Sequence, residues 1–298
     1  MKMKKTMAIF AVMALMVCSL AACGKGKEGP SKEPSDIQKE DDKNQGDDTK
    51  NPDEQEPSGT EEQQPNEMDT KPQVTVVSRY TFDNMEGTVV PDEGANGYAG
   101  NMFGSPETVE GKFGTALKLS GSNGVTIPVG AGTVGRQFTA SAWIKIDAGS
   151  PQRPYRILST GVWGDNTSGF QLGIATSYGN GCFVYCVGNA GGACYWNRQA
   201  EFSAPIMDGQ WHHIAIAFDM DAMLACGFLD GALMDIMTLP ASSNVAPWSA
   251  LSELSIGGAY VDSVLGESFV GVVDELCVVN YFFTEADVKY LMDNTVFE

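Results

Sequence analysis

Residues 269–280 read Phe269-Val270-Gly271-Val272-Val273-Asp274-Glu275-Leu276-Cys277-Val278-Val279-Asn280, an apolar and β-branched run without proline. Such a run is typical of a buried β-strand. Strict alternation would place Val272, Asp274, Leu276 and Val278 on one face and Val273, Glu275, Cys277 and Val279 on the other. Each face would then carry one carboxylate, and a buried carboxylate has to be hydrogen-bonded, paired with a cation or bound to a metal. We expect Asp274 to hold a structural cation that joins the last strand to the first; in the alternative, it accepts backbone N–H groups and binds no ion.

The segment around this strand, residues 73–298, predicts one all-β domain. Its 226 residues are enough for a full core, and glycines and short polar turns recur about every ten residues between apolar runs. The expected strands lie at 75–82, 115–119, 125–127, 138–146, 156–159, 170–175, 183–187, 193–196, 211–218, 223–229 and 254–256, before the closing strand. One short C-terminal helix should begin at the capping sequence Thr284-Glu285-Ala286-Asp287, with Val288, Leu291 and Met292 facing the sandwich.

The first 22 residues have the features of an export signal. A basic start, Met1 to Lys5, precedes a short apolar run that ends in Leu20-Ala21-Ala22-Cys23, which resembles a bacterial lipobox. The resemblance implies that Cys23 is lipidated and anchors the chain to the membrane at the bacterial cell surface. An ordinary secretory signal with an incidental cysteine is the alternative.

Residues 23–72 are expected to be a disordered linker. From Gly24 to Pro72 the chain has 15 acidic residues against 7 lysines and almost no large apolar side chains, so it cannot offset its ordering entropy by burial. The segment would give the domain reach across a cell-envelope layer. The folded part is acidic as well, with 9 basic residues against 23 acidic ones, which makes nucleic acid a poor partner; contact with the membrane is expected only through the lipid anchor.

Several motifs of the folded part resemble the laminin-G-like, concanavalin A-like jelly rolls. They occur in the family's order: Tyr80-Thr81-Phe82-Asp83, Gly111 to Gly121, Phe138 to Trp143, Asp208 to Ala215, Leu229-Asp230-Gly231 and Gly271 to Glu275. The resemblance implies two antiparallel sheets, one convex and one concave, with the first and last strands adjacent. It also implies a structural calcium ion on the convex side.

Carried onto this sequence, the calcium site would use the Asp274 carboxylate, the Asp83 carboxylate and the backbone carbonyl of Gly121. Calcium is a hard cation that takes such oxygen ligands. The segment around Asp92 departs from the family's pattern, which makes Asp92 a weak candidate for a further ligand.

No constellation of catalytic residues accompanies this fold in the sequence. Glucanases of this architecture carry paired carboxylates in a Glu-x-Asp-x-x-Glu pattern, about 5 Å apart for retaining chemistry, and no segment has that spacing. Alternation sends His212 and His213, the two histidines, to opposite faces of a strand. Their packing within the domain is therefore the favoured interpretation, although a Ser-His-Asp or Cys-His arrangement that uses one of them stays open.

The cysteines predict a disulfide in an exported protein. Pairing Val187 with Ala193 across a five-residue loop would put Cys186 opposite Cys194. The spacing of Cys182, Cys186 and Cys194 matches no common zinc site. Five cysteines leave at least one thiol unpaired within the chain, and buried free thiols account equally well for Cys226 and Cys277.

Aromatic, amide and charged residues in the loops are candidates for binding a sugar, because rings stack on sugar faces and polar groups bind hydroxyls. The candidates are Trp163, Asp165, Asn166, Tyr178, Asn180, Trp196, Asn197 and Arg198. The sequence thus predicts a non-catalytic, lipid-anchored surface domain that recognises extracellular carbohydrate or protein. The alternatives are an envelope structural or adhesion protein that contacts proteins and, less favoured, a divergent glycan-active enzyme.

Overall fold

The computed structural model describes residues 74–128, 134–159, 170–188, 194–239, 253–261 and 264–294. The chain divides into two units, Met1–Lys71 and Pro72–Glu298, and every described residue belongs to the second. The signal sequence, Cys23 and the linker lie outside the described residues. None of the helices within the described ranges is long and apolar enough to cross a membrane.

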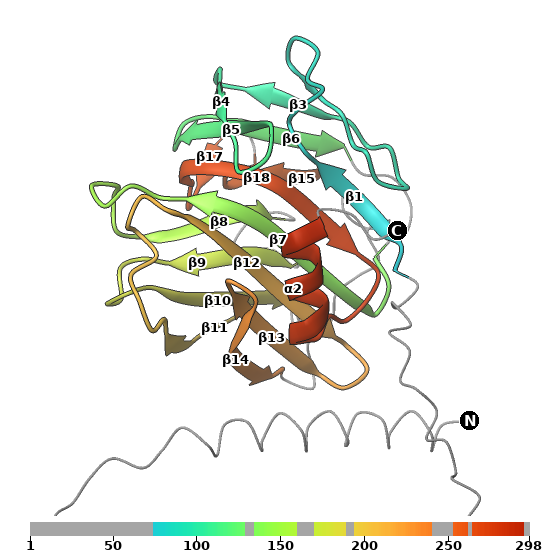
Figure 1. Cartoon of the computed structure of the whole chain (residues 1–298), viewed down its shortest axis with the longest axis vertical. Helices are drawn as coiled ribbons and strands as arrows, with labels where there is room; N and C mark the ends of the chain where they lie inside the picture. The colour runs from blue at the N-terminus through green and yellow to red at the C-terminus, as the bar shows by residue number, and fades with distance from the viewer. Residues whose placement is uncertain are drawn as a thin grey trace, which may run out of the picture. The chain divides into compact units, whose positions relative to one another are not determined.

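Two antiparallel sheets of eight strands each form a sandwich (Figure 1). Sheet A has the strand order β14-β13-β12-β7-β18-β5-β4, with β1 also paired to β18; sheet B has the order β11-β10-β9-β8-β15-β6-β3-β2. The strands of sheet A are β1 (Val76–Tyr80), β4 (Glu107–Glu110), β5 (Thr115–Ser120), β7 (Gln137–Lys145), β12 (Trp211–Asp219), β13 (Leu224–Leu229), β14 (Ala232–Thr238) and β18 (Val270–Val279). Those of sheet B are β2 (Val89–Val90), β3 (Gly100–Phe103), β6 (Gly124–Pro128), β8 (Pro154–Ser159), β9 (Gln171–Ala175), β10 (Cys182–Gly188), β11 (Cys194–Glu201) and β15 (Glu253–Ile256).

The closing strand β18 organises sheet A, as the sequence predicts. Its first half pairs with β5, its second half pairs with β1, and its other edge pairs with β7. Arg79 of β1 lies opposite Cys277 of β18, so the first and last strands are neighbours. A small hairpin of β16 (Ala259–Val261) and β17 (Val264–Gly266) leads from sheet B into β18.

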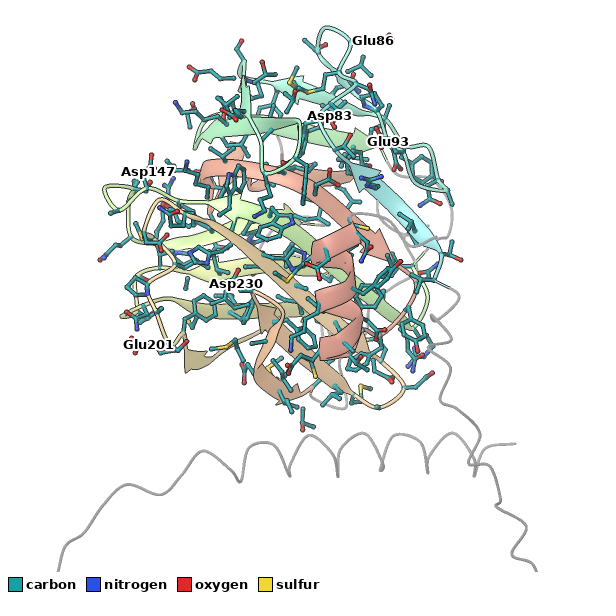
Figure 2. All side chains as sticks on the ribbon, viewed as in Figure 1. Asp83, Glu86, Glu93, Asp147, Glu201 and Asp230 are labelled. Carbon is teal, nitrogen blue, oxygen red and sulfur yellow. The ribbon has the colours of Figure 1, made fainter. Side chains whose placement is uncertain are left out.

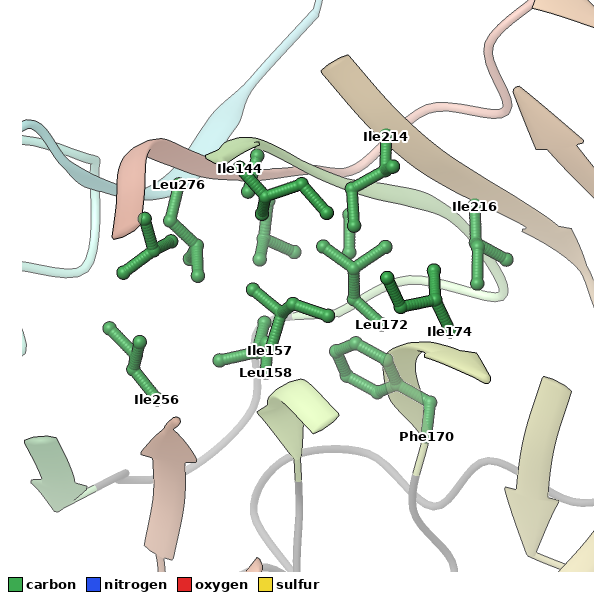
Figure 3. Packing of buried hydrophobic residues seen from close by; sticks show 14 of the residues in the cluster. Ile144, Ile157, Leu158, Phe170, Leu172, Ile174, Ile214, Ile216, Ile256 and Leu276 are labelled. Carbon is green, nitrogen blue, oxygen red and sulfur yellow. The ribbon is translucent and has the colours of Figure 1, made fainter. Parts of the chain in front are cut away.

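The core fills the space between the two sheets (Figure 3). The alternating residues Phe138, Ala140, Ala142 and Ile144 of β7, and Ile146 just after it, are fully buried in the core, which confirms the predicted pattern. From sheet B, the main contributions are Tyr155, Ile157, Leu158, Leu172, Ile174, Leu254 and Ile256. Because one face of each strand packs inward, the residues between these positions face outward.

The helix α2 (Glu285–Asn294) follows β18 and covers part of the outer face of sheet A (Figure 1). Thr284 caps it: the Thr284 amide donates to Asp287 Oδ2 at 2.8 Å, and the Asp287 amide donates back to Thr284 Oγ1 at 3.4 Å. Val288 and Leu291 are buried against a second cluster that includes Ala215 and Cys226. The predicted helix and its cap are confirmed.

Candidate functional site

A β-bulge in β18 sets the positions of its two carboxylates. Asp274 pairs with Trp143 and Cys277 with Ser141, so two residues of β18 oppose one residue of β7. Glu275 within the bulge has a φ of 46°. The strict alternation expected from the sequence is therefore wrong: Val273, Leu276 and Val278 point into the core, whereas Asp274 lies on the outer face beside Trp143.

Asp274 is fully buried and its carboxylate accepts backbone N–H groups. The Phe113 amide donates to Oδ2 at 3.0 Å, and the Glu275 amide donates to Oδ1 at 2.8 Å. Burial raises the pKa of Asp274 to about 6, although the backbone donors act in the opposite direction. A Cβ added at Gly111 would lie 2.5 Å from Oδ2, so the loop 111–114 packs directly on this carboxylate.

Asp83 holds the other end of the same loop. Its Oδ1 accepts the Thr115 amide at 2.6 Å, and a Cβ added at Gly114 would clash with the same Oδ1. Asp92 likewise accepts backbone hydrogen bonds: its Oδ1 accepts the amides of Arg79 and Gly94, each at 2.8 Å. The carboxylates predicted to hold an ion thus hold loops through hydrogen bonds.

Of the three predicted calcium ligands, Gly121 lies apart from Asp83 and Asp274, which both contact the loop 111–115. In the ladder between β18 and β5, Ser120 pairs with Val270 and Leu117 with Val273, so Gly121 lies at the opposite end from Asp274. Continuing the register, Gly121 is five residues from the position facing Asp274, about 16 Å along the strand. Arg153 Nη2 also lies 2.9 Å from the point where a Cβ on Gly121 would stand, and a guanidinium disfavours a nearby cation. Asp83, Gly121 and Asp274 therefore do not fit one calcium ion, and any requirement for calcium stays a prediction.

Glu275 pairs with Arg79 rather than with a metal. Arg79 Nη2 lies 2.9 Å from Glu275 Oε2, and Nη1 lies 3.6 Å from Glu93 Oε2. Burial raises the pKa of Glu275, and Arg79 opposes that rise. Figure 2 shows Asp83 and Glu93 on the segment that follows β1. In the described ranges no group of three or more His, Cys, Asp or Glu side chains is arranged to hold a metal.

The two histidines occupy different environments, as alternation predicts. His212 lies between two carboxylates, with Nδ1 2.8 Å from Asp230 Oδ2 and Nε2 3.2 Å from Asp208 Oδ1. The hydrogen bond to Asp230 raises the pKa of His212. His213 is 2% exposed and packs edge-on against Trp143 with ring centroids 5.2 Å apart. Burial lowers the pKa of His213 to about 4, so its role is packing.

The outer face of sheet B carries a row of polar residues that crosses five strands. In order across the sheet, they are Gln171, Ser159, Ser255, Thr126 and Asn101, and each lies opposite the next. We call these five residues the outer row. Gln171 is 1% exposed; its Nε2 donates to the Val184 carbonyl at 3.4 Å, while its buried Oε1 has no hydrogen-bond partner in the described part of the chain.

A charged pair lies beside the outer row on β8. Arg156 is 2% exposed, and its Nε lies 2.5 Å from Glu267 Oε2. Its Nη1 donates to Ser159 Oγ at 3.3 Å, which connects the pair to the row. Amide, hydroxyl and guanidinium groups are the kinds of polar group that bind sugar hydroxyls. Ser159 and Ser255 are 1% and 3% exposed, so this part of the row lies beneath the surface.

The predicted ligand-binding residues do not form one group. Tyr178 and Asn180 lie in the turn between β9 and β10, where Asn180 holds Glu201 and Phe202, whereas Gln171 lies at the opposite end of β9. Trp196, Asn197 and Arg198 lie on β11, and their side chains are outside the described set. Trp163, Asp165 and Asn166 fall in 160–169, outside the described residues.

Sequence reasoning did not identify the outer row, which nevertheless has a signal in the sequence. Gln171, Ser159 and Ser255 are single polar residues next to apolar strand residues, at positions where alternation points away from the core. The register that brings them together is not readable from one sequence.

The hairpin of β10 and β11 has a different register from the predicted one. Val187 pairs with Tyr195, so Cys186 lies opposite Trp196 and Cys194 opposite Gly188. Cys186 and Cys194 are diagonal neighbours, and such positions are about 7–8 Å apart, beyond the usual disulfide span. The expected direct pairing is wrong, although the bridge itself stays a prediction because both side chains are outside the described set. Cys226 and Cys277 are buried free thiols, and Cys182 is buried as well.

Comparisons with known proteins agree with this architecture. Residues 119–289 match the Laminin_G_3 family model, described as the concanavalin A-like lectin/glucanases superfamily. The comparison with curated proteins gave no match. Among solved structures, domain 4 of AbnA, a GH43 extracellular arabinanase from Geobacillus stearothermophilus in complex with arabinotriose, has 19% identity and a TM-score of 0.52; the match covers 73% of this chain and 98% of that one.

Toxin binding domains are also similar. The botulinum neurotoxin serotype G binding domain has 13% identity and a TM-score of 0.55, over 72% of this chain and 50% of that one. The botulinum neurotoxin DC binding domain in complex with rat synaptotagmin II has 14% identity and a TM-score of 0.54, over 75% and 52%. This chain thus spans about half the length of those domains. At these identities, the likeness shows the fold alone.

Proposed function

Because this chain belongs to the laminin-G-like family of the concanavalin A-like lectin/glucanases superfamily, we propose that it is a non-catalytic domain that binds extracellular carbohydrate. We further propose that Cys23 is lipidated and anchors the domain to the bacterial cell surface, with residues 24–72 as the spacer. The lipobox-like sequence before Cys23 and the acidic, apolar-poor composition of the spacer support this part.

The observation that carries the binding proposal is the outer row of sheet B, and above all Gln171. Leaving a buried amide oxygen without a donor costs about 1–3 kcal/mol, and a sugar hydroxyl that donates to Oε1 would recover that cost. The hydroxyls of Ser159, Ser255 and Thr126 continue the row at the strand spacing, about 4.8 Å. That spacing suits a ligand with a hydroxyl on every ring. Ser159 and Ser255 are buried, and Ser255 Oγ donates to the Gly258 carbonyl at 2.6 Å, so Gln171 remains the main candidate contact.

Non-catalytic binding is favoured over glycan turnover because the nearby carboxylates already have partners within the protein. Glycosidic cleavage needs two carboxyl groups about 5–10 Å apart across the ligand. Beside the outer row, Glu267 forms a pair with Arg156. Asp274 and Asp83 hold the loop 111–115 through hydrogen bonds instead of facing a ligand.

A binding experiment tests this proposal. The full-length protein in detergent is applied to an array of neutral glycans, and the best ligand is titrated against wild type, Gln171→Met and the control Gln210→Met, which changes an exposed glutamine. We expect Gln171→Met to weaken binding roughly 5-fold, as for one lost hydrogen bond, and Gln210→Met to leave it unchanged. Melting temperatures of all three proteins exclude a folding defect as the cause.

Two outcomes would overturn the proposal. If no glycan is retained, the alternative of an adhesion or structural protein that contacts other proteins is favoured. If the retained glycan is cleaved, and Glu267→Gln abolishes the release of reducing ends, the domain is an enzyme.

A further inference from the structure

A row of residues on the outer face of sheet A combines two lysines and a tryptophan. Lys118 of β5 lies opposite Val272 of β18, Val272 lies opposite Lys145 of β7, and Lys145 lies opposite Trp211 of β12. These four residues, here called the lysine row, share one face because directly paired residues point the same way. At about 4.8 Å per strand, Lys118 and Lys145 are about 10 Å apart along the row.

A third lysine extends this surface toward the next row. Lys112, in the loop held by Asp274, places its Nζ 4.3 Å from the centroid of the Trp143 ring. Trp143 lies two residues before Lys145 on β7 and therefore on the same face. The hydrogen bond between the Phe113 amide and Asp274 fixes the loop, and thus the position from which Lys112 projects.

The concentration of positive charge here is unusual for this chain. The protein has a formal net charge of −19, yet three of the four lysines in residues 73–298 lie on this surface. Lys118 forms an exposed pair with Glu107 at 3.3 Å, which is a weak and exchangeable interaction. Lys112 and Lys145 have no ion pair with any residue that the structure describes, even though carboxylates outnumber cations.

Trp211 supplies an aromatic ring at the end of the row. The residue is partly exposed, and its indole makes no ring contact or hydrogen bond with the described residues. Exposed tryptophan faces stack on the apolar faces of sugar rings. The row thus offers one ring beside Lys145 and, on Lys145 and Lys118, two positive groups for negative charges.

We infer that the lysine row, with Lys112, binds a carboxylated polysaccharide such as a polyuronate across sheet A. A polymer with one carboxylate per sugar carries charges about 5 Å apart, so every second charge matches the spacing of about 10 Å between Lys118 and Lys145. Nucleic acid is a poorer match because its higher charge density would be repelled by the acidic remainder of the domain. This surface is on the other sheet from the outer row, so the inference goes beyond the function proposed above.

Affinity electrophoresis of the full-length protein in detergent tests the inference. The gels contain polygalacturonate, its methyl-esterified form, which keeps the backbone but not the charge, or polyglutamate, which has carboxylates without sugar rings. Lys145→Gln is compared with Lys289→Gln, which removes the same charge from α2, and with Lys112→Gln/Lys145→Gln. The polygalacturonate gels are run at both low and moderate salt.

We expect polygalacturonate to retard the wild type more strongly than either other polymer. Lys145→Gln should weaken binding roughly 3- to 5-fold and the double variant roughly 10-fold, as for exposed ion pairs. Lys289→Gln should have less than about a 2-fold effect, and added salt should weaken retention by screening. Three outcomes would overturn the inference. They are equal effects of Lys145→Gln and Lys289→Gln, equal retention by the esterified polymer or by polyglutamate, and no retention by polygalacturonate. The outcome is independent of Gln171, because neutral glycans and Gln171→Met test the other sheet.

Discussion

Acid should destabilise this domain through His213, a prediction that follows from its buried position. The ring is 2% exposed, packs on Trp143 and has a pKa lowered by burial to about 4, against 6.5 in the unfolded chain. The folded state therefore stays neutral at pH values where the unfolded state takes up a proton. Stability from this group is complete above pH 6.5 and is lost as the pH falls toward 4.

The size of the effect follows from the pKa of about 4 in the folded state against 6.5 in the unfolded chain, since a tenfold change in proton affinity corresponds to about 1.4 kcal/mol. Integrated over pH, His213 should cost about 2 kcal/mol of stability by pH 5 and about 3 kcal/mol by pH 4. His213→Phe removes this titration. Nδ1 of the ring is buried and has no hydrogen-bond partner among the described residues, so phenylalanine removes no polar contact there.

Urea unfolding of the full-length protein, followed by tryptophan fluorescence, measures the effect. The difference in unfolding free energy between His213→Phe and wild type should shift by about 2 kcal/mol in favour of the variant between pH 7.5 and pH 5. Groups that titrate equally in both proteins cancel in this comparison. His213→Leu repeats the test if phenylalanine is too large. A pH-independent difference would refute the assigned burial of a neutral His213.

Three further predictions concern neighbouring groups. His212→Gln should show the opposite pH dependence from His213→Phe, because hydrogen bonding to Asp230 raises the pKa of His212. The stability that His212 contributes is complete below pH 6.5 and is lost as the pH rises through its folded-state pKa. A stability advantage of wild type over the variant that grows with pH would contradict this prediction. Gly114→Ala should destabilise the fold by at least about 1–3 kcal/mol, because φ is +50° and the new Cβ would meet Asp83 Oδ1; unchanged urea unfolding would show that the loop gives way. Adding calcium or a chelator should move the melting temperature by less than about 1 °C. Asp274→Asn should lower the free energy of unfolding by about 1–3 kcal/mol, because one backbone N–H loses its acceptor. Stoichiometric calcium in the purified protein would contradict the assignment of Asp274 as a hydrogen-bond acceptor for the loop.

Much of the fold is predictable from the sequence because it depends on local patterns. The alternation in β7, the cap of α2 at Thr284 and the adjacency of β1 and β18 follow from periodicity, capping chemistry and family motifs. Strands β2, β3, β4 and β14 were not predicted, since they are short or half-exposed and carry few β-branched apolar residues in alternation.

The sites are harder to predict because they depend on register. The bulge at Glu275 changes which residues of β18 face the core, and nothing in an apolar run marks where an extra residue is inserted. The same holds for Cys186: the pairing register of β10 and β11 differs by two residues from the predicted one, so the residue opposite Cys186 is Trp196 instead of Cys194. The outer row and the lysine row each join residues from several strands, so they appear only once the pairing is known.

The most direct test of the central claim is the side-chain amide signal of Gln171. In a ¹⁵N-labelled full-length sample titrated with the tightest-binding neutral oligosaccharide, the binding account predicts a saturable shift of the Gln171 amide resonance and none for exposed Gln210. A Gln171 signal that stays in place while the oligosaccharide reaches saturation would show that carbohydrate, if it binds, does not bind at the outer row of sheet B.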